Sequence, residues 1–177
     1  SVQPKIKNLL NNNQFDYAGA SGGFIDVFCY PFCRGRIFQS IEVDQGQYDN
    51  IRDVFWASGS CLFIERKSYL SLGGLDHEFF AHMEEIDLCW RIWNNGNKVA
   101  VVPESKVYHV GGGTLQKANP RKTFLNFRNG LSLLIKNEPK KVGGEISQNV
   151  VQFVIRYRYS SMSGKTSSVE QKTFIST

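Results

Sequence analysis

The stretch Glu84-Glu-Ile-Asp-Leu-Cys-Trp-Arg-Ile-Trp-Asn94, followed by the apolar run Val99-Ala-Val-Val-Pro103, decides which fold the sequence favours. Acidic residues occupy its first turn, apolar residues recur at helical spacing, and Asn95-Gly96 supplies a stop signal. This pattern predicts a helix over 84–94. The apolar run behind the glycine predicts a buried strand. A helix that leads into such a strand indicates an α/β fold.

The lengths of the two elements place their far ends at one edge of the molecule. The helix rises roughly 17 Å at about 1.5 Å per residue, and the strand from Lys98 to Pro103 returns about 20 Å at about 3.3 Å per residue. We therefore expect the acids at 84–87 to share one rim with His109. Gly111-Gly-Gly113 follows the histidine and predicts a mobile loop. Acids, a histidine and a glycine loop on one rim are typical of an active site.

Each of these features also has a purely structural explanation. Acids at a helix start are favoured by the helix dipole and by unpaired backbone N–H groups, so they can serve stability alone. A single histidine after a strand is often a hydrogen-bonded structural residue, and three glycines can form a simple turn. The residue pattern by itself leaves both interpretations open.

Weaker patterns predict the remaining elements. Strands are predicted at 54–57, 60–64 and 106–110, and a short helix at 66–72 that ends at Gly73-Gly74. Residues 1–50 are rich in glycine and loop residues and predict little regular structure. Together these elements predict a mixed sheet flanked by helices.

A long helix is predicted from Asn119-Pro120 to Asn137. Its apolar stripe is formed by Phe124, Phe127, Leu131, Leu134 and Ile135. Residues 146–159 predict one more amphipathic segment, and the Ser/Thr-rich end from Ser160 is expected to be disordered. This divides the chain into a folded part over 1–137 and a C-terminal helical extension with a disordered tail over 138–177.

Composition restricts the class of protein. With 177 residues, 41% hydrophobic and 13% aromatic, the chain can bury a core and is not a disordered sequence. No apolar run approaches the roughly 20 residues of a spanning helix, and no leader pattern opens the sequence. We expect a cytoplasmic protein. The four cysteines are expected to be reduced and buried, and a zinc site built on Cys29 and Cys33 lacks a second ligand pair.

Charge is distributed unevenly along the chain. Residues 1–114 carry a net charge of −3, and residues 115–177 carry +8. A basic C-terminal third can meet phosphates, nucleic acid or the anionic inner face of the cell membrane, or it can simply be a solvated helix face. No nucleic-acid-binding motif is recognised, so no specific nucleic-acid partner is expected.

Several motifs in fixed order resemble family 2 glycosyltransferases, in the bacterial rhamnosyltransferase-like branch that builds surface polysaccharides. The matching stretches are Phe55-Trp-Ala-Ser-Gly-Ser-Cys-Leu-Phe-Ile64, Gly73-Gly-Leu-Asp-His-Glu-Phe-Phe80, Met83-Glu-Glu-Ile-Asp-Leu-Cys-Trp-Arg91, Val107-Tyr-His-Val-Gly111 and Asn119-Pro-Arg-Lys-Thr-Phe-Leu-Asn-Phe-Arg-Asn129. Stretches near Tyr17 and Tyr30 also look like this branch, so the resemblance covers most of residues 15–137.

The resemblance implies the C-terminal, acceptor-side portion of a GT-A fold and an inverting sugar transfer. The family's base lies in an acidic pair at the start of the helix, and its second position falls on Glu85, with Glu84 and Asp87 as alternatives. A carboxylate suits this task because the acceptor hydroxyl must lose its proton as it attacks the anomeric carbon. The resemblance implies a nucleotide-sugar donor and a glycan or lipid-linked acceptor.

The resemblance also implies residues that bind the cation and the substrates. In relatives, a histidine at the position of His109 helps to hold Mn²⁺ or Mg²⁺ at the leaving diphosphate. Arg121, Lys122, Arg128 and Asn129 are expected to contact substrate, with arginine suited to a bidentate diphosphate contact. Trp56 is a candidate for sugar stacking, whereas Trp90 and Trp93, on the apolar stripe, are expected to pack in the core.

The nucleotide-binding units and the Asp-x-Asp metal motif of the family have no counterpart in residues 1–177. The expectation is therefore that this chain carries the acceptor side and the base, while most of the donor and cation site lies in an absent N-terminal half. The alternative is an inactive carbohydrate-binding or scaffold remnant. Oligomeric state is not indicated by the sequence.

Overall fold

The computed structural model describes residues 1–26, 30–110 and 120–137. Expectations about the glycine loop at 111–113, the segment at 146–159, the Ser/Thr-rich end and Cys29 lie outside these residues. So does the whole of the predicted C-terminal extension.

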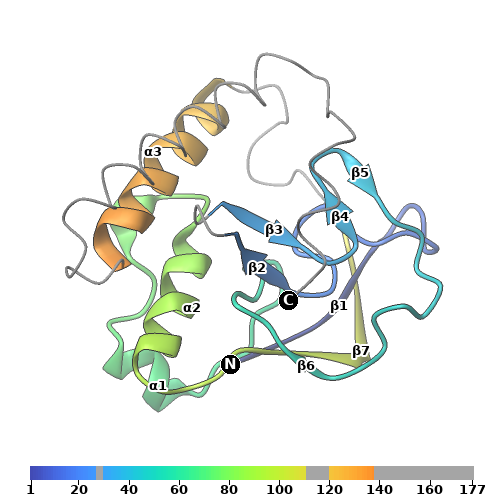
Figure 1. The fold of residues 1–177 in the computed structure, drawn as a ribbon, viewed down its shortest axis with the longest axis horizontal. Helices are drawn as coiled ribbons and strands as arrows, with labels where there is room; N and C mark the ends of the chain where they lie inside the picture. The colour runs from blue at the N-terminus through green and yellow to red at the C-terminus, as the bar shows by residue number, and fades with distance from the viewer. Residues whose placement is uncertain (27–29, 111–119, 138–177) are drawn as a thin grey trace.

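Two small sheets and three α-helices make up the described chain, which confirms a mixed α/β architecture (Figure 1). The first sheet has the order β1-β7-β6, formed by Val2–Asn8, Ala100–His109 and Arg52–Asp53. β7 runs parallel to β1 and antiparallel to β6, so this sheet is mixed. The second sheet is an antiparallel meander of β2 (Gly23–Ile25), β3 (Pro31–Cys33), β4 (Arg36–Ile37) and β5 (Ser40–Ile41).

The first fifty residues are more regular than the sequence predicted, because β1 lies in the interior while carrying polar residues. Gln3 and Lys5 are both fully buried residues. Gln3 accepts a 2.7 Å hydrogen bond from the Ser58 N–H, and Lys5 forms ion pairs with Asp44 and Asp49. Buried polar groups with partners replace the apolar alternation on which a strand prediction depends.

Acid should weaken the ion pairs around Asp44. Hydrogen bonds from Lys5 and Lys7 outweigh burial of the carboxyl and lower the pKa of Asp44 to about 2. Because the pKa is lower in the folded chain than its ordinary value of 3.8, the stabilisation is complete above about pH 5 and is lost as pH falls through about 2. We expect Asp44→Asn to lower the free energy of unfolding at pH 7. The difference in unfolding free energy between the native chain and this variant should shrink below pH 4. Urea unfolding at stepped pH measures this gap. Asp53→Asn, in an exposed pair with Lys98, should show little gap at any pH.

β7 is one strand with an irregularity, where the sequence predicted two strands. Pro4 pairs with Val102 and the next residue, Lys5, pairs with Lys106, so three residues of β7 bulge out at Pro103. Proline has no N–H to give to a ladder, which favours this position for the bulge. The bulge accommodates Pro103 while the two halves keep a common partner in β1.

The predicted strands at 54–57 and 60–64 are wrong. This segment pairs with its neighbours only at single points, Trp56 with Gly23 and Phe63 with Val2. Apolar residues are frequent here because Val54, Trp56 and Ala57 enter the core, not because the segment extends a sheet. Short apolar runs do not distinguish these cases.

The helices match the sequence closely. α1 spans Arg66–Ser71 and is followed by two glycines with positive φ. α2 spans Glu84–Asn94, and the turn after it contains Gly96 with φ of 75°. α3 spans Pro120–Asn137 and lies alongside α2 (Figure 1). A short 3₁₀ helix, η1 (His77–Phe79), precedes α2.

The buried face of α3 differs from the predicted stripe. Phe124 and Ile135 are 60% and 68% exposed, whereas Asn129 and Asn137 are buried with Leu125, Leu133 and Leu134. The helix therefore presents a partly polar face to α2. A prediction based on apolar spacing alone missed it, because two asparagines occupy core positions.

The core lies between α2, α3 and the 54–57 segment. Its buried members include Phe15, Val54, Trp56, Phe79, Ile86, Leu88, Trp90, Ile92, Val99, Val101, Leu133 and Leu134. Trp90 packs edge-on against Phe55, and Trp93 donates to the Phe55 carbonyl at 3.0 Å, which confirms core packing for both tryptophans. Cys33 and Cys89 are buried free thiols and Cys61 is a partly buried one. In the described part of the chain, no helix has the length and apolar character needed to cross a membrane.

Candidate active site

The turn that leads into α2 is built from residues in rare backbone conformations. Phe80, His82 and Met83 have φ of 60°, 70° and 74°, although none of them is glycine. Phe80 is the centre of a tight turn in which the Ala81 N–H donates to the Phe79 carbonyl at 2.7 Å. Left-handed residues of this kind each cost on the order of 1–3 kcal/mol and gather at functional sites. The acids that follow therefore begin α2 from a strained turn.

Glu84 and Glu85 carry buried carboxyl oxygens. The Oε2 atoms of both residues have no hydrogen-bond partner within the described chain. Burial, and then the charge of Glu84, raise the pKa of Glu85 to about 7, while backbone N–H groups of Gly59 and Ile86 act in the opposite direction. A carboxyl group of this kind exchanges its proton near neutral pH, which is the property required of a general base.

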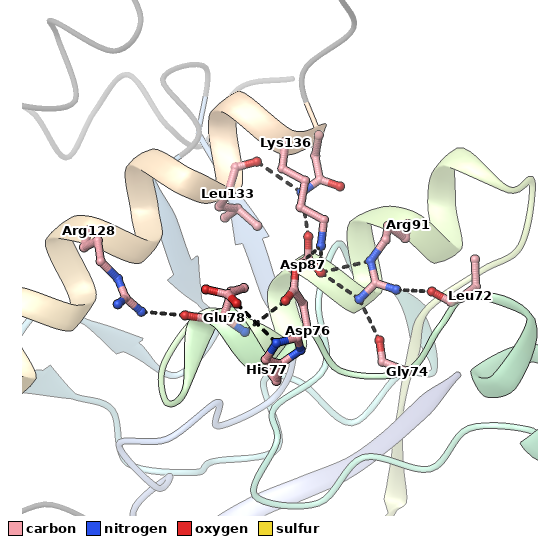
Figure 2. Close-up of polar contacts among 11 residues, drawn as sticks. Leu72, Gly74, Asp76, His77, Glu78, Asp87, Arg91, Arg128, Leu133 and Lys136 are labelled. Atoms are coloured by element: carbon pink, nitrogen blue, oxygen red, sulfur yellow. Dashed lines mark hydrogen bonds and ion pairs between the residues drawn. The ribbon is translucent and has the colours of Figure 1, made fainter.

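Asp87 has a different environment, which Figure 2 shows. Its side chain is 0% exposed, and its Oδ2 accepts hydrogen bonds from Arg91 at 2.6 and 2.9 Å and from Lys136 at 2.9 Å. Its Oδ1 accepts from the Asn137 amide at 2.8 Å. Both oxygens are thus occupied by donors from α2 and α3, and this carboxylate joins the two helices.

Arg91 extends the Asp87 network to the turn after α1. Its guanidinium group donates to the carbonyl oxygens of Leu72, at 2.5 Å, and Gly74, at 2.8 Å (Figure 2). Lys136 also pairs with Asp76 at 2.7 Å. One buried carboxylate therefore fixes the relative positions of α1, α2 and α3.

His109 lies at the end of β7 beside a buried carboxylate that the sequence did not single out. Its Nδ1 is 3.0 Å from Oδ1 of Asp16, which is 1% exposed. An ionised carboxylate can only accept, so Nδ1 carries the proton and Nε2 of the neutral ring is left as an acceptor or ligand atom. This tautomer, inferred from the Asp16 contact, suits a cation ligand. Within the described residues, no three His, Cys, Asp or Glu side chains group as a complete metal site.

Contacts across two loops connect His109 with Glu85. Asp16 accepts from the Ala18 N–H at 2.7 Å, and the Ala18 carbonyl accepts from the Ser58 hydroxyl at 2.9 Å. The next residue, Gly59, lies against the Glu85 side chain. His109 and Glu85 are thus connected through these loops. That they lie on one rim of the molecule stays a prediction.

Arg128 and Asn129, expected to contact substrate, bind the backbone instead. Asn129 is 1% exposed, and its amide nitrogen lies 2.7–2.9 Å from the carbonyls of Phe79, Ala81 and His82. Arg128 donates to the carbonyls of Glu78 and Phe79 at 2.7 and 3.1 Å. Both side chains support the strained turn, and the Asn129 amide has no hydrogen left for a substrate.

Trp56 is not placed as a sugar-stacking residue. Its side chain is 5% exposed, its Nε1 donates to the Phe24 carbonyl at 3.0 Å, and its ring lies directly against Gly23. A Cβ added to Gly23 would come within 1.9 Å of the indole, so the backbone covers the ring. Trp56 therefore belongs to the core.

Arg121 and Lys122, at the start of α3, lie close to the strained turn. The Arg121 guanidinium lies 4.6 Å from the centre of the Phe80 ring. Burial, and then the charge of Lys122, lower the pKa of His82, whose buried Nε2 has no partner in the described residues. His82 was not predicted as a site residue. Its place two residues before Glu84 was a signal that could have found it.

The chain is similar over part of its length to curated sugar transferases. It is 40% identical over 58 residues to N-acetylglucosaminyl-diphospho-decaprenol L-rhamnosyltransferase of Mycobacterium tuberculosis, a match that covers 33% of this chain and 19% of that protein. It is 26% identical over 147 residues to dTDP-rhamnosyl transferase RfbF of Shigella flexneri, which covers 75% of this chain and 48% of that protein. A hexosyltransferase of low-salt glycan biosynthesis in Haloferax volcanii, Agl10, is 34% identical over 64 residues, 34% of this chain and 21% of that protein.

The matched segments thus span less than half the length of these relatives. No protein-family model matches the chain. These similarities support a glycosyltransferase function at a general level.

Proposed function

We propose that residues 1–137 form the acceptor-side and catalytic-base portion of an inverting family 2 glycosyltransferase with the GT-A fold. The observation that carries the proposal is the Glu85 carboxyl, with a buried oxygen that lacks a partner in the described chain and a pKa raised to about 7. It stands at the start of a helix in a chain similar to named rhamnosyltransferases. We propose that the rest of the donor site lies in sequence outside this chain.

In the proposed reaction, Glu85 removes the proton of an acceptor hydroxyl. The freed oxygen attacks the anomeric carbon, and the bond from that carbon to the nucleoside diphosphate breaks on the opposite face, which inverts the configuration. Glu85 suits the first step because its unpaired oxygen can accept the proton without first losing a hydrogen bond. Burial, and then the charge of Glu84, keep the pKa of Glu85 high, and Asp87 is left as a structural residue because its oxygens are occupied.

A divalent cation, Mn²⁺ or Mg²⁺, would neutralise charge on the leaving diphosphate. Of the described residues, His109 fits such a cation, since its Nδ1 is bound to Asp16 and its Nε2 is left as a ligand atom. The remaining ligands are proposed to come from sequence outside the described residues. Arg121 and Lys122 are proposed to lie near the substrate phosphates, because the Arg121 guanidinium lies over the Phe80 ring and the charge of Lys122 acts on His82, both in the strained turn.

Transfer by the full-length protein tests this proposal. The assay combines a panel of nucleotide sugars, with dTDP-rhamnose first, and a lipid-linked N-acetylglucosamine diphosphate as acceptor, following the names of the Shigella and Mycobacterium relatives. Release of nucleoside diphosphate that depends on both the acceptor and Mn²⁺ or Mg²⁺ is the expected result. Glycan binding without such release for any donor would contradict the proposal and favour a non-catalytic binding protein.

A further inference from the structure

Two neighbouring side chains of α3 hold the strained turn before α2. Asn129 reaches the carbonyls of Phe79, Ala81 and His82 with a single amide nitrogen. Arg128 reaches the carbonyls of Glu78 and Phe79, and Figure 2 shows its contact with Glu78. Every residue from 78 to 82 except Phe80 thus presents its carbonyl to this pair. We call Arg128 and Asn129 the α3 clamp.

The orientation of the Asn129 amide is set by Arg128. Nε of Arg128 donates to Oδ1 of Asn129 at 2.9 Å. Guanidinium nitrogens only donate, so the oxygen of the amide must face Arg128 and its nitrogen must face the turn. The two residues act as one unit, since loss of Arg128 removes the donor that keeps the amide aligned.

The turn needs such a clamp because its backbone is unfavourable by itself. Phe80 has φ 60° and ψ −57°, the conformation of a rare γ-turn, and His82 and Met83 are left-handed. Met83 is the N-cap of α2 and provides no side-chain cap. Strain of this kind persists only where surrounding contacts determine the conformation. Here the clamp supplies those contacts, because it binds four of the five carbonyls of residues 78–82.

We propose that Asn129, aligned by Arg128, is a positioning residue that fixes where Glu84 and Glu85 enter α2 and keeps their carboxyl groups buried side by side. This inference rests on the proposed function for its catalytic meaning, but the geometry itself can be tested without it. The second attachment, Asp87 to Lys136 and Asn137, holds α2 about two turns further along α3. The clamp therefore acts on the turn and the acids, while the Asp87 network keeps the helices together.

The test compares Asn129→Leu and Arg128→Met with Asn126→Leu, on the same helix but only partly buried and outside the clamp. The pKa of the Glu85 carboxyl is followed by ¹³C NMR in the isolated chain, with Glu85→Gln to assign its signal. In both clamp variants we expect the pKa to fall from about 7 towards its ordinary value of 4.5, because a relaxed turn hydrates the carboxyl and separates it from Glu84. Asn126→Leu should leave the pKa unchanged.

Kinetics of the full-length protein provide the second measurement. We expect the clamp variants to lower kcat at least 10-fold while KM for the donor stays within about 2-fold, since the clamp orients the base and does not contact donor. If Asn129→Leu fails to fold, Arg128→Met carries the test, since it leaves the buried amide in place. A folded Arg128→Met variant with the native Glu85 pKa overturns the inference, whether or not the protein transfers sugar. A lowered Glu85 pKa in the clamp variants, together with a native protein that transfers no sugar, would retain the clamp and reject the proposed function.

Discussion

Replacing Glu85 by glutamine is expected to lower the rate of sugar transfer by about 10²- to 10⁴-fold, the range that general-base catalysis usually contributes. Glutamine keeps the size of the side chain and its place at the start of α2, but its amide cannot take the acceptor proton. The loss should appear in kcat, because the base acts in the chemical step and not in donor binding. Initial rates at saturating donor and acceptor measure it.

The pH dependence separates Glu85 from its neighbour. Since burial and the charge of Glu84 raise the pKa of Glu85 to about 7, the native rate should increase as pH rises through 7, where the carboxyl loses its proton. Glu84→Gln removes the like charge, so the pKa of Glu85 should fall and the rising limb should move to lower pH. The exposed Glu78 supplies the control, because Glu78→Gln leaves both carboxyls in place. Full activity in Glu85→Gln would exclude this residue as the base and return attention to Glu84.

The helices could be predicted from sequence because their signals are local. The acids before Ile86, the glycines after Leu72 and Asn95, and Pro120 each act within one or two turns, and the structure begins or ends its helices at these points. The length of α2 also followed from its local signals, whereas β7 was predicted as two shorter strands, 99–103 and 106–110. The helix signals do not depend on distant partners, whereas β7 is a single strand because both of its halves pair with β1.

The buried polar residues could not be predicted, because their partners are far away in sequence. Lys5 lies in the core because Asp44 and Asp49 meet it, and Asn129 because three carbonyls of another segment face it. The same limit applies to the site. Asp16 and His109 are 93 residues apart, and no local pattern joins them. Sequence pattern identified the acids at 84–87 but could not show that, among the described residues, Glu85 has an oxygen without a partner while both oxygens of Asp87 are hydrogen-bonded.

Asp87→Asn is expected to lower the free energy of unfolding by about 3–5 kcal/mol, as when one partner of a buried ion pair is removed. The asparagine has the same shape, but its NH₂ group must face Arg91, Lys136 or Asn137, all of which are donors at this site. Arg91 and Lys136 would then lose the buried carboxylate that both of them contact. The loss is a large fraction of the 5–15 kcal/mol typical of a domain, so partial unfolding at 37 °C should follow.

Asp76→Asn is the matched control for Asp87→Asn, because Asp76 contacts the same Lys136 at 2.7 Å from a partly exposed position. We expect it to lose less than about 1 kcal/mol, since water replaces the missing charge. Urea unfolding of both variants at pH 7 gives the two values. A fully stable Asp87→Asn variant without transfer activity would contradict the assignment of Glu85 as the base and Asp87 as a structural residue. Asp87 would then be the base, and other contacts would hold α1, α2 and α3 together. A destabilised variant that transfers sugar below its unfolding temperature would leave proton removal to Glu85, because an asparagine at position 87 cannot act as a base.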